Sequence, residues 1–401
     1  MPACGRSRTP GKNDRSAHDM SKLKVVRVVT ASYVVPWHMA NTLQRMPADF
    51  DVTVVGQGVS IHQDAYPGIR WIDIDLNRKV RIFSDLASLW ALCRFFISHR
   101  PDIVHSIMPK AGLISALAGF ICRVPVRMHT FTGQVWATQR QPARAFTYCI
   151  DRLINGLNTI CLTDSASQSA FLLQKNISHQ GNPLPVLASG SLSGVEPSRF
   201  DRRQLQSRID NFRSELGIGT EDFVFVTIAR KSLDKGAADL LSAFSLVAAT
   251  HPDAKLLFVG PDESDGWLPT LKRTRPAMFN RVINVGAVDS HEAYLCLGNV
   301  LCVPSHREGF GSIVIDAAAA GLPAIGSNIV GLVDAIDDGN TGVLFPAGDI
   351  EKLAGTMCSM LENRPRCIEM GAAAKRRVES LFTADKLYAA LRAFYLAQVN
   401  R

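Results

Sequence analysis

The sequence predicts an α/β protein made of two doubly wound, Rossmann-like domains that face each other across a cleft. The chain has 401 residues, and chains longer than about 250–300 residues divide their core between domains. Short apolar runs rich in β-branched residues alternate with helical stretches in both halves, as expected for parallel sheets covered on both faces. Glycine, serine and proline cluster at 189–210, which is typical of a domain boundary.

The alternation of strands and helices also sets the expected domain limits. We expect a first domain over residues 21–195, a second over 196–380, and a final helix over 381–401 that could pack back on the first domain. Residues 1–20 are polar, basic and broken by glycine and proline, so we interpret them as a disordered tail. The expected strands are 24–30, 51–56, 70–74, 102–107, 125–130 and 158–164 in the first domain, and 222–229, 254–260, 281–286, 299–305, 322–327 and 341–347 in the second.

The charge balance of the chain is basic. Lysine and arginine number 44 against 36 acidic residues, which gives a net charge of +8. An excess of base suits anionic partners such as phosphate-bearing small molecules or an anionic membrane surface, and we expect no nucleic-acid partner. No uninterrupted apolar stretch reaches the roughly 18 residues that a membrane-spanning helix requires, so we expect no such helix.

Two carboxylates flank a glycine-containing turn at 305–326, where the sequence reads SHREGFGSIVIDAAAAGLPAIG. Glu308 follows the strand expected at 299–305, and Asp316 lies eight residues later. The intervening turn opens a helix that begins near Ser312, so Asp316 is one turn inside that helix. Both acids are therefore expected at the carboxyl end of a parallel strand, where open α/β sheets bind their ligands.

The turn between the two acids suits a phosphate. Gly309 and Gly311 permit a tight turn and leave room for a ligand beside bare backbone. Free N–H groups at 310–312 would point into the cleft and could bind a phosphate, while carboxylates accept hydrogen bonds from the neighbouring hydroxyls of a sugar. The pattern fits a nucleotide-sugar, in which a diphosphate lies between two sets of hydroxyl groups.

Two cations follow the first strand of the second domain. Arg230 and Lys235 lie five residues apart in ARKSLDKG, directly after the strand expected at 222–229. Both side chains could converge on a diphosphate and compensate the charge that develops on it as a leaving group. Taken alone, this segment would equally fit two solvated cations on a surface loop.

These segments together resemble family 4 of the retaining glycosyltransferases. The resemblance is carried by GFGSIVIDAAAAGLPAIGSNIVGLVDAIDDGNTGVLF after Glu308, and by ARKSLDKG, FVGP and HREGFG. It covers the chain from about residue 24 to the end and is strongest in the second half. It implies the GT-B fold, with an N-terminal acceptor-side domain and a C-terminal domain that binds a nucleotide-sugar, and it implies transfer with retention at the anomeric carbon.

The resemblance also implies roles for single residues. Glu308 matches the acid that contacts the hydroxyls of the donor sugar, and Asp316 matches the acid that holds the donor ribose, where the family usually has glutamate. Arg230 and Lys235 match the pair that binds the donor diphosphate. With these cations and a helix end supplying positive charge, we expect no metal and no cofactor. Gly309, Phe310, Gly311 and Ser312 match the substrate-binding loop and the start of its helix.

The first domain matches the family less completely. His129, at the end of the strand expected at 125–130, matches a histidine that contacts the donor sugar across the cleft, and the segment TFTGQVWAT follows at 130–138. Many family members have a glycine-rich loop after the first strand that approaches the donor phosphates. This chain has TASYVVPWHMA at 30–40 instead, so we expect phosphate contacts from this loop to be weakened; Ser32 could donate one hydrogen bond.

Two other segments invite a functional interpretation. The helix expected at 82–97 follows Arg78, Lys79 and Arg81, and it could either pack in the core or lie on a membrane surface with Trp90 and Phe95 in the lipid. The sequence DID at 73–75 resembles a metal-binding motif of a different glycosyltransferase fold, but it lies on an expected strand, and we do not predict a metal there.

The resulting hypothesis is a retaining glycosyltransferase that moves a sugar from a nucleotide diphosphate to an acceptor hydroxyl. The acceptor would be a saccharide, most simply a lipid-linked one in cell-surface polysaccharide or lipopolysaccharide synthesis, and the protein would be peripheral at the cytoplasmic face of the membrane. Two alternatives stay open at this point, a nucleotide-sugar epimerase on the same scaffold and a catalytically silent saccharide-binding protein. The sequence does not identify the donor base, the sugar, the linkage or the oligomeric state.

Overall fold

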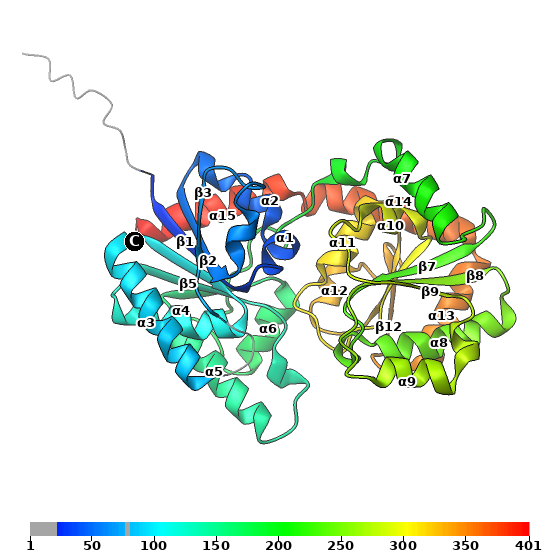
Figure 1. Ribbon diagram of the computed structural model, residues 1–401, viewed down its shortest axis with the longest axis horizontal. Helices are drawn as coiled ribbons and strands as arrows, with labels where there is room; N and C mark the ends of the chain where they lie inside the picture. The colour runs from blue at the N-terminus through cyan, green and yellow to red at the C-terminus, as the bar shows by residue number, and fades with distance from the viewer. Residues whose placement is uncertain (1–21, 77–80, 401) are drawn as a thin grey trace, which may run out of the picture.

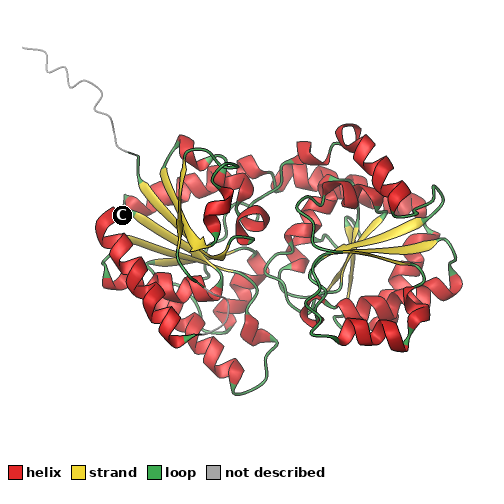
Figure 2. Cartoon of the chain, viewed as in Figure 1, coloured by secondary structure: helices red, strands yellow, loops and turns green. Residues whose placement is uncertain are grey.

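The chain folds into two α/β domains, each built on its own six-stranded parallel sheet (Figure 1). The computed structural model describes residues 22–76 and 81–400, so the expected tail and the basic residues Arg78 and Lys79 lie outside the described residues. Helices cover both faces of each sheet (Figure 2). All twelve expected strands are present, and the prediction of two doubly wound domains is confirmed.

The first sheet has the strand order β3-β2-β1-β4-β5-β6. Its central strand β1 is buried along most of its length, as its near-continuous apolar sequence predicts. The strands are β1 (Lys24–Ala31), β2 (Asp51–Gln57), β3 (Ile69–Asp73), β4 (Ile103–Ile107), β5 (Val126–Phe131) and β6 (Ile160–Thr163). The helices are α1 (Val34–His38), α2 (Ala40–Leu43), α3 (Ile82–His99), α4 (Pro109–Ile121), α5 (Ala143–Leu157) and α6 (Ala166–Gln174).

The second sheet repeats this topology with the order β12-β11-β10-β7-β8-β9. In each sheet the first and fourth strands of the domain are neighbours, and the crevice between their loops is where doubly wound sheets bind ligands. The strands are β7 (Phe223–Ile228), β8 (Ala254–Val259), β9 (Val282–Val285), β10 (Val300–Val303), β11 (Ala324–Ser327) and β12 (Gly342–Phe345). The helices are α7 (Arg202–Glu215), α8 (Ala237–Thr250), α9 (Trp267–Thr274), α10 (Glu292–Leu297), α11 (Ser312–Ala319), α12 (Leu332–Ala335), α13 (Ile350–Glu362) and α14 (Arg364–Leu381).

The chain crosses between the domains twice, and the two crossings are hydrogen-bonded to each other. The amide of Val195 donates to the carbonyl of Phe382 over 2.8 Å, and the amide of Ala384 donates to the carbonyl of Val195 over 2.8 Å. After the second crossing, helix α15 (Ala384–Val399) lies against the N-terminal domain (Figure 1). Its fully buried Tyr395 belongs to the core of that domain, so the last helix packs against the first sheet.

Helix α3 presents an apolar face to solvent, but the exposed residues differ from those expected. Trp90 is 62% exposed and Phe83 is 89% exposed, whereas Phe95 is half-buried and stacks on His99 with ring centroids 5.0 Å apart. The expectation that Phe95 belongs to the exposed face is therefore wrong, because it lies on the side of the helix that packs against the domain. Leu86, at 57% exposed, extends the exposed face. Among the described residues, no helix is both long enough and apolar enough to cross a membrane.

Candidate active site

The predicted site residues of the second domain meet where β10 and β7 lie side by side. Lys235 ends the short turn after β7, and Glu308 lies in the loop after β10. Because these strands are neighbours, the two loops lie together at the carboxyl edge of the sheet. Lys235 Nζ is 2.6 Å from Glu308 Oε1, which also accepts a hydrogen bond from Ser305 Oγ over 2.8 Å. The structure thus brings together an acid and a cation 73 residues apart in sequence.

Arg230 lies in the same loop as Lys235 but is paired with other acids. Its guanidinium forms ion pairs with Glu263 and, over 3.0 Å, with Asp234 Oδ2. Burial opposes the charge of Arg230, but the hydrogen bond to Glu263 and the two carboxylates outweigh it and raise its pKa. The neighbouring Lys231 turns inward, where its ammonium donates to the carbonyl of Val285 over 2.7 Å. Lys231 is thus held by backbone carbonyls, whereas Arg230 and Lys235 pair with carboxylates at the edge of the sheet.

Asp316 is held by a histidine that sequence reasoning did not identify. His291 Nε2 donates to Asp316 Oδ2 over 3.0 Å. Burial alone would lower the pKa of His291, but the hydrogen bond to Asp316 and its charge raise it. The ring of His291 stacks on Trp37 from the N-terminal domain, with centroids 5.7 Å apart and planes 14° apart. Asp316 thus lies at a contact between the two domains, beside an aromatic side chain that is 42% exposed.

The turn between the two acids is tightly packed. Gly311 has φ +89°, and a Cβ there would lie 2.5 Å from Leu332, so this position favours glycine for both conformation and space. The ring of Phe310 is 2% exposed and packs against Phe382, which anchors the loop in the core rather than offering the ring to a ligand. Ser312 is half-buried at the first position of α11.

The backbone of this turn is covered in part by a later loop. A Cβ on Gly331 would lie 2.5 Å from the carbonyl oxygen of Gly309 and 3.0 Å from the amide nitrogen of Phe310. The loop before α12 therefore packs close to the amide of Phe310, and the expectation that the amides of 310–312 point into a cleft and bind a phosphate stays a prediction. Gly309 itself faces the N-terminal domain, where its carbonyl accepts a hydrogen bond from Ser165 Oγ over 2.7 Å.

The N-terminal domain meets this turn through the segment after β5. A Cβ on Gly133 would lie 2.8 Å from the carbonyl carbon of Glu308, and the carbonyl of Gly133 accepts a hydrogen bond from Arg307 Nη1 over 2.7 Å. Asp164, after β6, lies against Gly309 so closely that a Cβ on Gly309 would overlap its carboxyl group. The loops after β5 and β6 therefore contact the Glu308 loop directly.

His129 lies deeper than its expected role requires. The ring is 1% exposed, its Nδ1 is 2.9 Å from Ser106 Oγ, and it fits against Gly112 of α4, where a Cβ would lie 2.5 Å from Cε1. Burial lowers the pKa of His129 to about 3, so the ring is neutral at physiological pH. His129 therefore supports the start of the segment that leads to Gly133, and the structure places the ring under α4.

Another imidazole of the N-terminal domain lies nearer to the predicted site. Burial, and next the charge of Lys235, lower the pKa of His38 to about 4, while Glu308 acts in the opposite direction. His38 Nδ1 is buried, and it has no hydrogen-bond partner among the described residues. His38 ends α1, within the segment at 30–40 that replaces the glycine-rich loop. The segment after the first strand of a doubly wound sheet borders the ligand site, and this position could have identified His38 from the sequence. A five-residue helix is too short for its periodicity to show which side chain faces the site.

Asp164 is a third residue that sequence reasoning missed. It is 3% exposed, and Oδ1 has no hydrogen-bond partner among the described residues. Burial raises the pKa of Asp164 well above its usual range, and the charges of Glu308 and Asp334 add to this effect. The carboxyl group therefore favours its protonated form, which could donate a hydrogen bond toward the Glu308 loop. An acid at the end of the strand expected at 158–164 was the available signal.

The DID segment makes local contacts. Asp73 accepts a hydrogen bond from the amide of Ser60 over 3.1 Å, and Asp75 accepts one from Ser84 Oγ over 3.0 Å. Within 22–76 and 81–400, no group of three histidine, cysteine or acidic side chains is placed to hold a metal ion.

Two family models match the chain. The model described as "Glycosyl transferase 4-like domain" matches residues 32–179, and the model described as "Glycosyl transferases group 1" matches residues 208–377. Each match falls within one of the two domains. Both models describe transferases, which favours sugar transfer over the epimerase and over the silent saccharide-binding protein.

Similar proteins extend over nearly the whole chain. Over 382 residues the chain is 27% identical to the capsular polysaccharide biosynthesis glycosyltransferase CapM of Staphylococcus aureus, covering 94% of this chain and 97% of that protein. It is 23% identical over 301 residues to the UDP-Gal:alpha-D-GlcNAc-diphosphoundecaprenol alpha-1,3-galactosyltransferase of Escherichia coli, covering 72% of this chain and 74% of that protein. Similarity to these transferases thus includes both domains.

Solved structures share the same architecture. The structure of Anabaena HepE in complex with UDP and glucose superposes with a TM-score of 0.76 at 15% identity, covering 94% of this chain and 100% of that chain. WaaG, a glycosyltransferase involved in lipopolysaccharide biosynthesis, superposes with a TM-score of 0.68 at 14% identity, covering 92% and 98%. Together with the two family models and the paired acids and cations at the edge of the second sheet, this fold identifies the chain as a glycosyltransferase of family 4, with the GT-B fold.

Proposed function

We propose that this glycosyltransferase moves a sugar from a nucleotide diphosphate donor to an acceptor hydroxyl, with retention, in the synthesis of a surface polysaccharide. The observation that carries the proposal is the contact between Lys235 and Glu308 at the edge of the second sheet, facing Gly133 of the first domain. In this proposal Lys235 binds the diphosphate, Glu308 accepts hydrogen bonds from the sugar, and the first domain binds the acceptor. The names of CapM and of the Escherichia coli galactosyltransferase support the surface-polysaccharide context.

Donor binding would exchange the internal ion pairs for contacts with the ligand. Lys235 and Arg230 would form ion pairs with the diphosphate in place of their present carboxylate partners. Glu308 would then accept hydrogen bonds from the sugar hydroxyls. Asp316, oriented by His291, would accept hydrogen bonds from the ribose. The cations would stabilise the charge that develops on the leaving diphosphate. A departing phosphate oxygen would in turn accept the proton of the attacking hydroxyl on the same face of the sugar, which gives retention.

The first domain would contribute the neutral imidazole of His38. Because its Nδ1 is buried without a partner among the described residues and lies within the electrostatic influence of Lys235 and Glu308, a bound donor would supply the missing hydrogen bond. His129 would act as a positioning residue that holds the segment leading to Gly133. This assignment replaces the donor contact that the sequence predicted for His129.

The exposed apolar face of α3 would hold the enzyme at an anionic membrane that carries a lipid-linked acceptor. Phe83, Leu86 and Trp90 share this face, and Arg94 lies over the ring of Trp90 at 4.7 Å from its centroid. The expected result is binding to anionic vesicles at low salt, with release as salt rises, because salt screens the attraction to the head groups. Trp90→Ser should weaken binding, whereas Ile368→Ser, at an exposed apolar position of α14, should not. Equal binding of both variants would contradict the proposal.

The test of the function is donor binding followed by transfer. Calorimetry with UDP-, GDP- and ADP-sugars should identify one nucleotide class that binds, and Asp316→Asn should weaken that binding while Asp316→Glu, the family's usual acid, retains it. Transfer to a lipid-linked saccharide should then proceed in EDTA, since Arg230 and Lys235 supply the charge. Loss of transfer in EDTA with rescue by Mg²⁺ would overturn the metal-independent mechanism, and failure of every nucleotide-sugar to bind would overturn the proposed function.

A further inference from the structure

A buried arginine in the first sheet lacks a counter-charge. Arg27 lies in the middle of β1 and is 3% exposed, and its neighbours across the sheet are Val54 and His105. Its Nη1 donates to Tyr395 Oη over 3.2 Å, while its Nε is buried without a partner among the described residues. In the described part of the chain, no aspartate or glutamate forms an ion pair with Arg27, although arginine side chains stay charged in proteins.

Hydrogen bonds continue from Arg27 through Tyr395 to His105 and Thr130. Because Arg27 can only donate, Tyr395 Oη accepts from it, and in the tautomer of His105 that is protonated on Nε2 the hydroxyl donates to His105 Nδ1, 2.7 Å away. Burial, and next the charge of Arg27, lower the pKa of His105 well below its usual range, so its ring carries one proton. That proton is then on Nε2 and is donated to Thr130 Oγ1 over 2.7 Å. In this tautomer the hydroxyl proton of Thr130 is available to a further acceptor.

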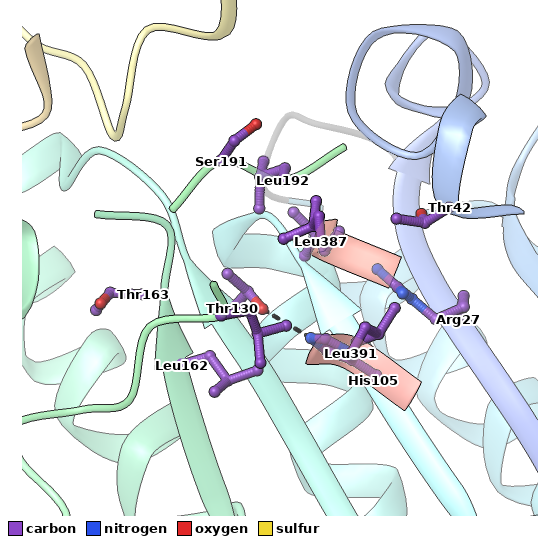
Figure 3. Close-up of a pocket in the computed structure, with 12 residues that line it drawn as sticks. Arg27, Thr42, His105, Thr130, Leu162, Thr163, Ser191, Leu192, Leu387 and Leu391 are labelled. Carbon is purple, nitrogen blue, oxygen red and sulfur yellow. Dashed lines mark hydrogen bonds between the residues drawn. The ribbon is translucent and has the colours of Figure 1, made fainter. Parts of the chain in front are cut away.

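Both ends of this chain border one cavity (Figure 3). The cavity is small, with about 20 Å³ open to the centre of a water-sized sphere, and it lies between the first sheet, the segment before the first domain crossing, and α15. Arg27, His105 and Thr130 line it together with the hydroxyl-bearing Thr163 and Ser191. Figure 3 shows the Arg27 guanidinium between β1 and α15, and the bond from His105 to Thr130 on the opposite side. Donor groups therefore border this space, and none of the described residues that line it carries a carboxylate.

We propose that this cavity binds a small inorganic anion, of chloride to phosphate size, as the counter-ion of Arg27. An unpaired charge in the interior is strongly destabilising, and a water molecule can accept hydrogen bonds there but does not neutralise the charge. An anion supplies acceptors for Arg27 and Thr130 and the missing negative charge together. Because the cavity lies between the first sheet and α15, a bound anion would stabilise the docking of the last helix on the N-terminal domain.

The first test measures thermal unfolding of the full chain at constant ionic strength. Sodium gluconate, whose anion is too large for the cavity, is replaced stepwise by sodium chloride, bromide or phosphate. The expected result is a saturable rise of the unfolding midpoint by about 2–4 °C with at least one of the small anions. A response to halides alone would identify a monatomic ligand, and a response to phosphate would identify an oxyanion. Equal midpoints in all four salts would overturn the proposal in favour of a cavity that holds water.

Variants separate this site from the other cationic sites of the protein. Arg27→Met should lose the anion-dependent rise while the diphosphate-binding residues Arg230 and Lys235 stay in place. Arg127→Met is the matched control, because Arg127 is also on an inner strand but donates to the carbonyls of Leu157 and Val124. The control should lose stability and keep the rise. An equal rise in wild type and Arg27→Met would show that the anion binds elsewhere and would overturn the proposal.

A second measurement does not depend on the stability of a variant. Crystals of the wild-type chain grown in bromide should show an anomalous peak in this cavity, beside the Arg27 guanidinium. A cavity without such a peak, in crystals whose protein showed a bromide-dependent rise, would contradict the assignment of that rise to Arg27.

Discussion

The two domains have the same strand order but use polar side chains in opposite ways at their facing edges. In the C-terminal domain the important groups are charged and paired, such as Glu308 with Lys235 and Asp316 with His291. In the N-terminal domain they are buried or half-buried, and burial of their polar atoms favours the neutral forms, as in Asp164 and His38. One fold thus offers a charged surface on one side of the site and an uncharged one on the other.

This difference is consistent with a division of work between the domains. A charged pair can be exchanged for a charged ligand at little cost, because the cation gains an ion pair with the ligand and the acid gains charge-assisted hydrogen bonds when the old pair is lost. Neutral buried groups cannot attract a diphosphate, but they can form hydrogen bonds without adding charge near the reacting carbon. Under the proposed function, the N-terminal domain would orient the sugar and acceptor, and the C-terminal domain would bind the donor and stabilise the leaving group.

The largest effect is expected from removing the charge of the C-terminal side. Glu308→Gln keeps the size of the side chain but removes charge-assisted hydrogen bonds to the sugar, which strengthen as positive charge develops in the transition state. We expect turnover to fall on the order of 100-fold, while donor affinity falls less. Steady-state kinetics and donor calorimetry measure both, with Glu369→Gln on the exposed face of α14 as the control. Near-normal turnover of folded Glu308→Gln would contradict the catalytic assignment.

The buried neutral groups of the N-terminal domain should make the free energy of unfolding depend on pH. The pKa of His129 is about 3 in the folded protein, against 6.5 for the free imidazole. Between these values the unfolded state binds more protons than the folded state, so the free energy of unfolding rises with pH in this window. Acidification from pH 7 to pH 5 should therefore lower the free energy of unfolding by about 2 kcal/mol through His129. Asp151, whose pKa burial raises to about 6, acts in the opposite direction.

The check is a set of urea titrations at several pH values. His129→Gln should be less stable than wild type at pH 7, but its unfolding free energy should fall less on acidification. A variant with the wild-type slope would show that His129 is not held neutral by burial. His38 and His105 remain in this variant, so a reduced slope rather than a flat one is expected.

The sequence was informative wherever a pattern reports directly on the backbone. Apolar β-branched runs such as 24–30 identified the strands, and strand order then explains why Glu308 and Lys235, in different loops, are in contact. Patterns were less informative about direction. His129 and Thr130 are consecutive on β5, so their side chains point to opposite faces, and sequence alone does not show which face each one meets. Contacts between domains, such as that of Gly133 with Glu308, depend on how the two sheets are oriented.

A smaller effect is expected from His38, which tests whether the neutral side touches the donor. His38→Ala removes one hydrogen bond to the ligand, so we expect a loss of about tenfold in kcat/KM, whereas His38→Gln, which keeps a donor and an acceptor, should retain more activity. Because the pKa of His38 is about 4, His38 does not titrate near pH 6.5. The pH profiles of wild type and His38→Gln should therefore have the same shape in this range. Wild-type kinetics in His38→Ala would limit His38 to a structural role.

The smallest expected effect comes from the contact between the domains. A Cβ added by Gly133→Ala would lie 2.8 Å and 2.9 Å from the carbonyl carbon and oxygen of Glu308, and 3.0 Å from the amide of Gly309. Backbone atoms cannot turn aside as a flexible side chain can, so the two loops must separate by some tenths of an ångström. We expect about a fivefold loss in kcat/KM, since small misplacements of reacting groups are costly.

The control and the stability measurement distinguish this displacement from a folding defect. Gly156→Ala places a methyl group on α5 where nothing lies within 4 Å, so activity should be unchanged and stability equal or slightly higher, because alanine favours a helix over glycine. Gly133→Ala should unfold at nearly the wild-type midpoint, since each domain keeps its own core. If Gly133→Ala is fully active, the contact of Gly133 with Glu308 is not needed during turnover. The loop of Gly133 would then lie farther from Glu308 during the reaction than it does in this structure. If activity falls while the midpoint holds, the distance between the two loops itself limits the reaction, which is the result expected when a charged site and a neutral site must meet around one sugar.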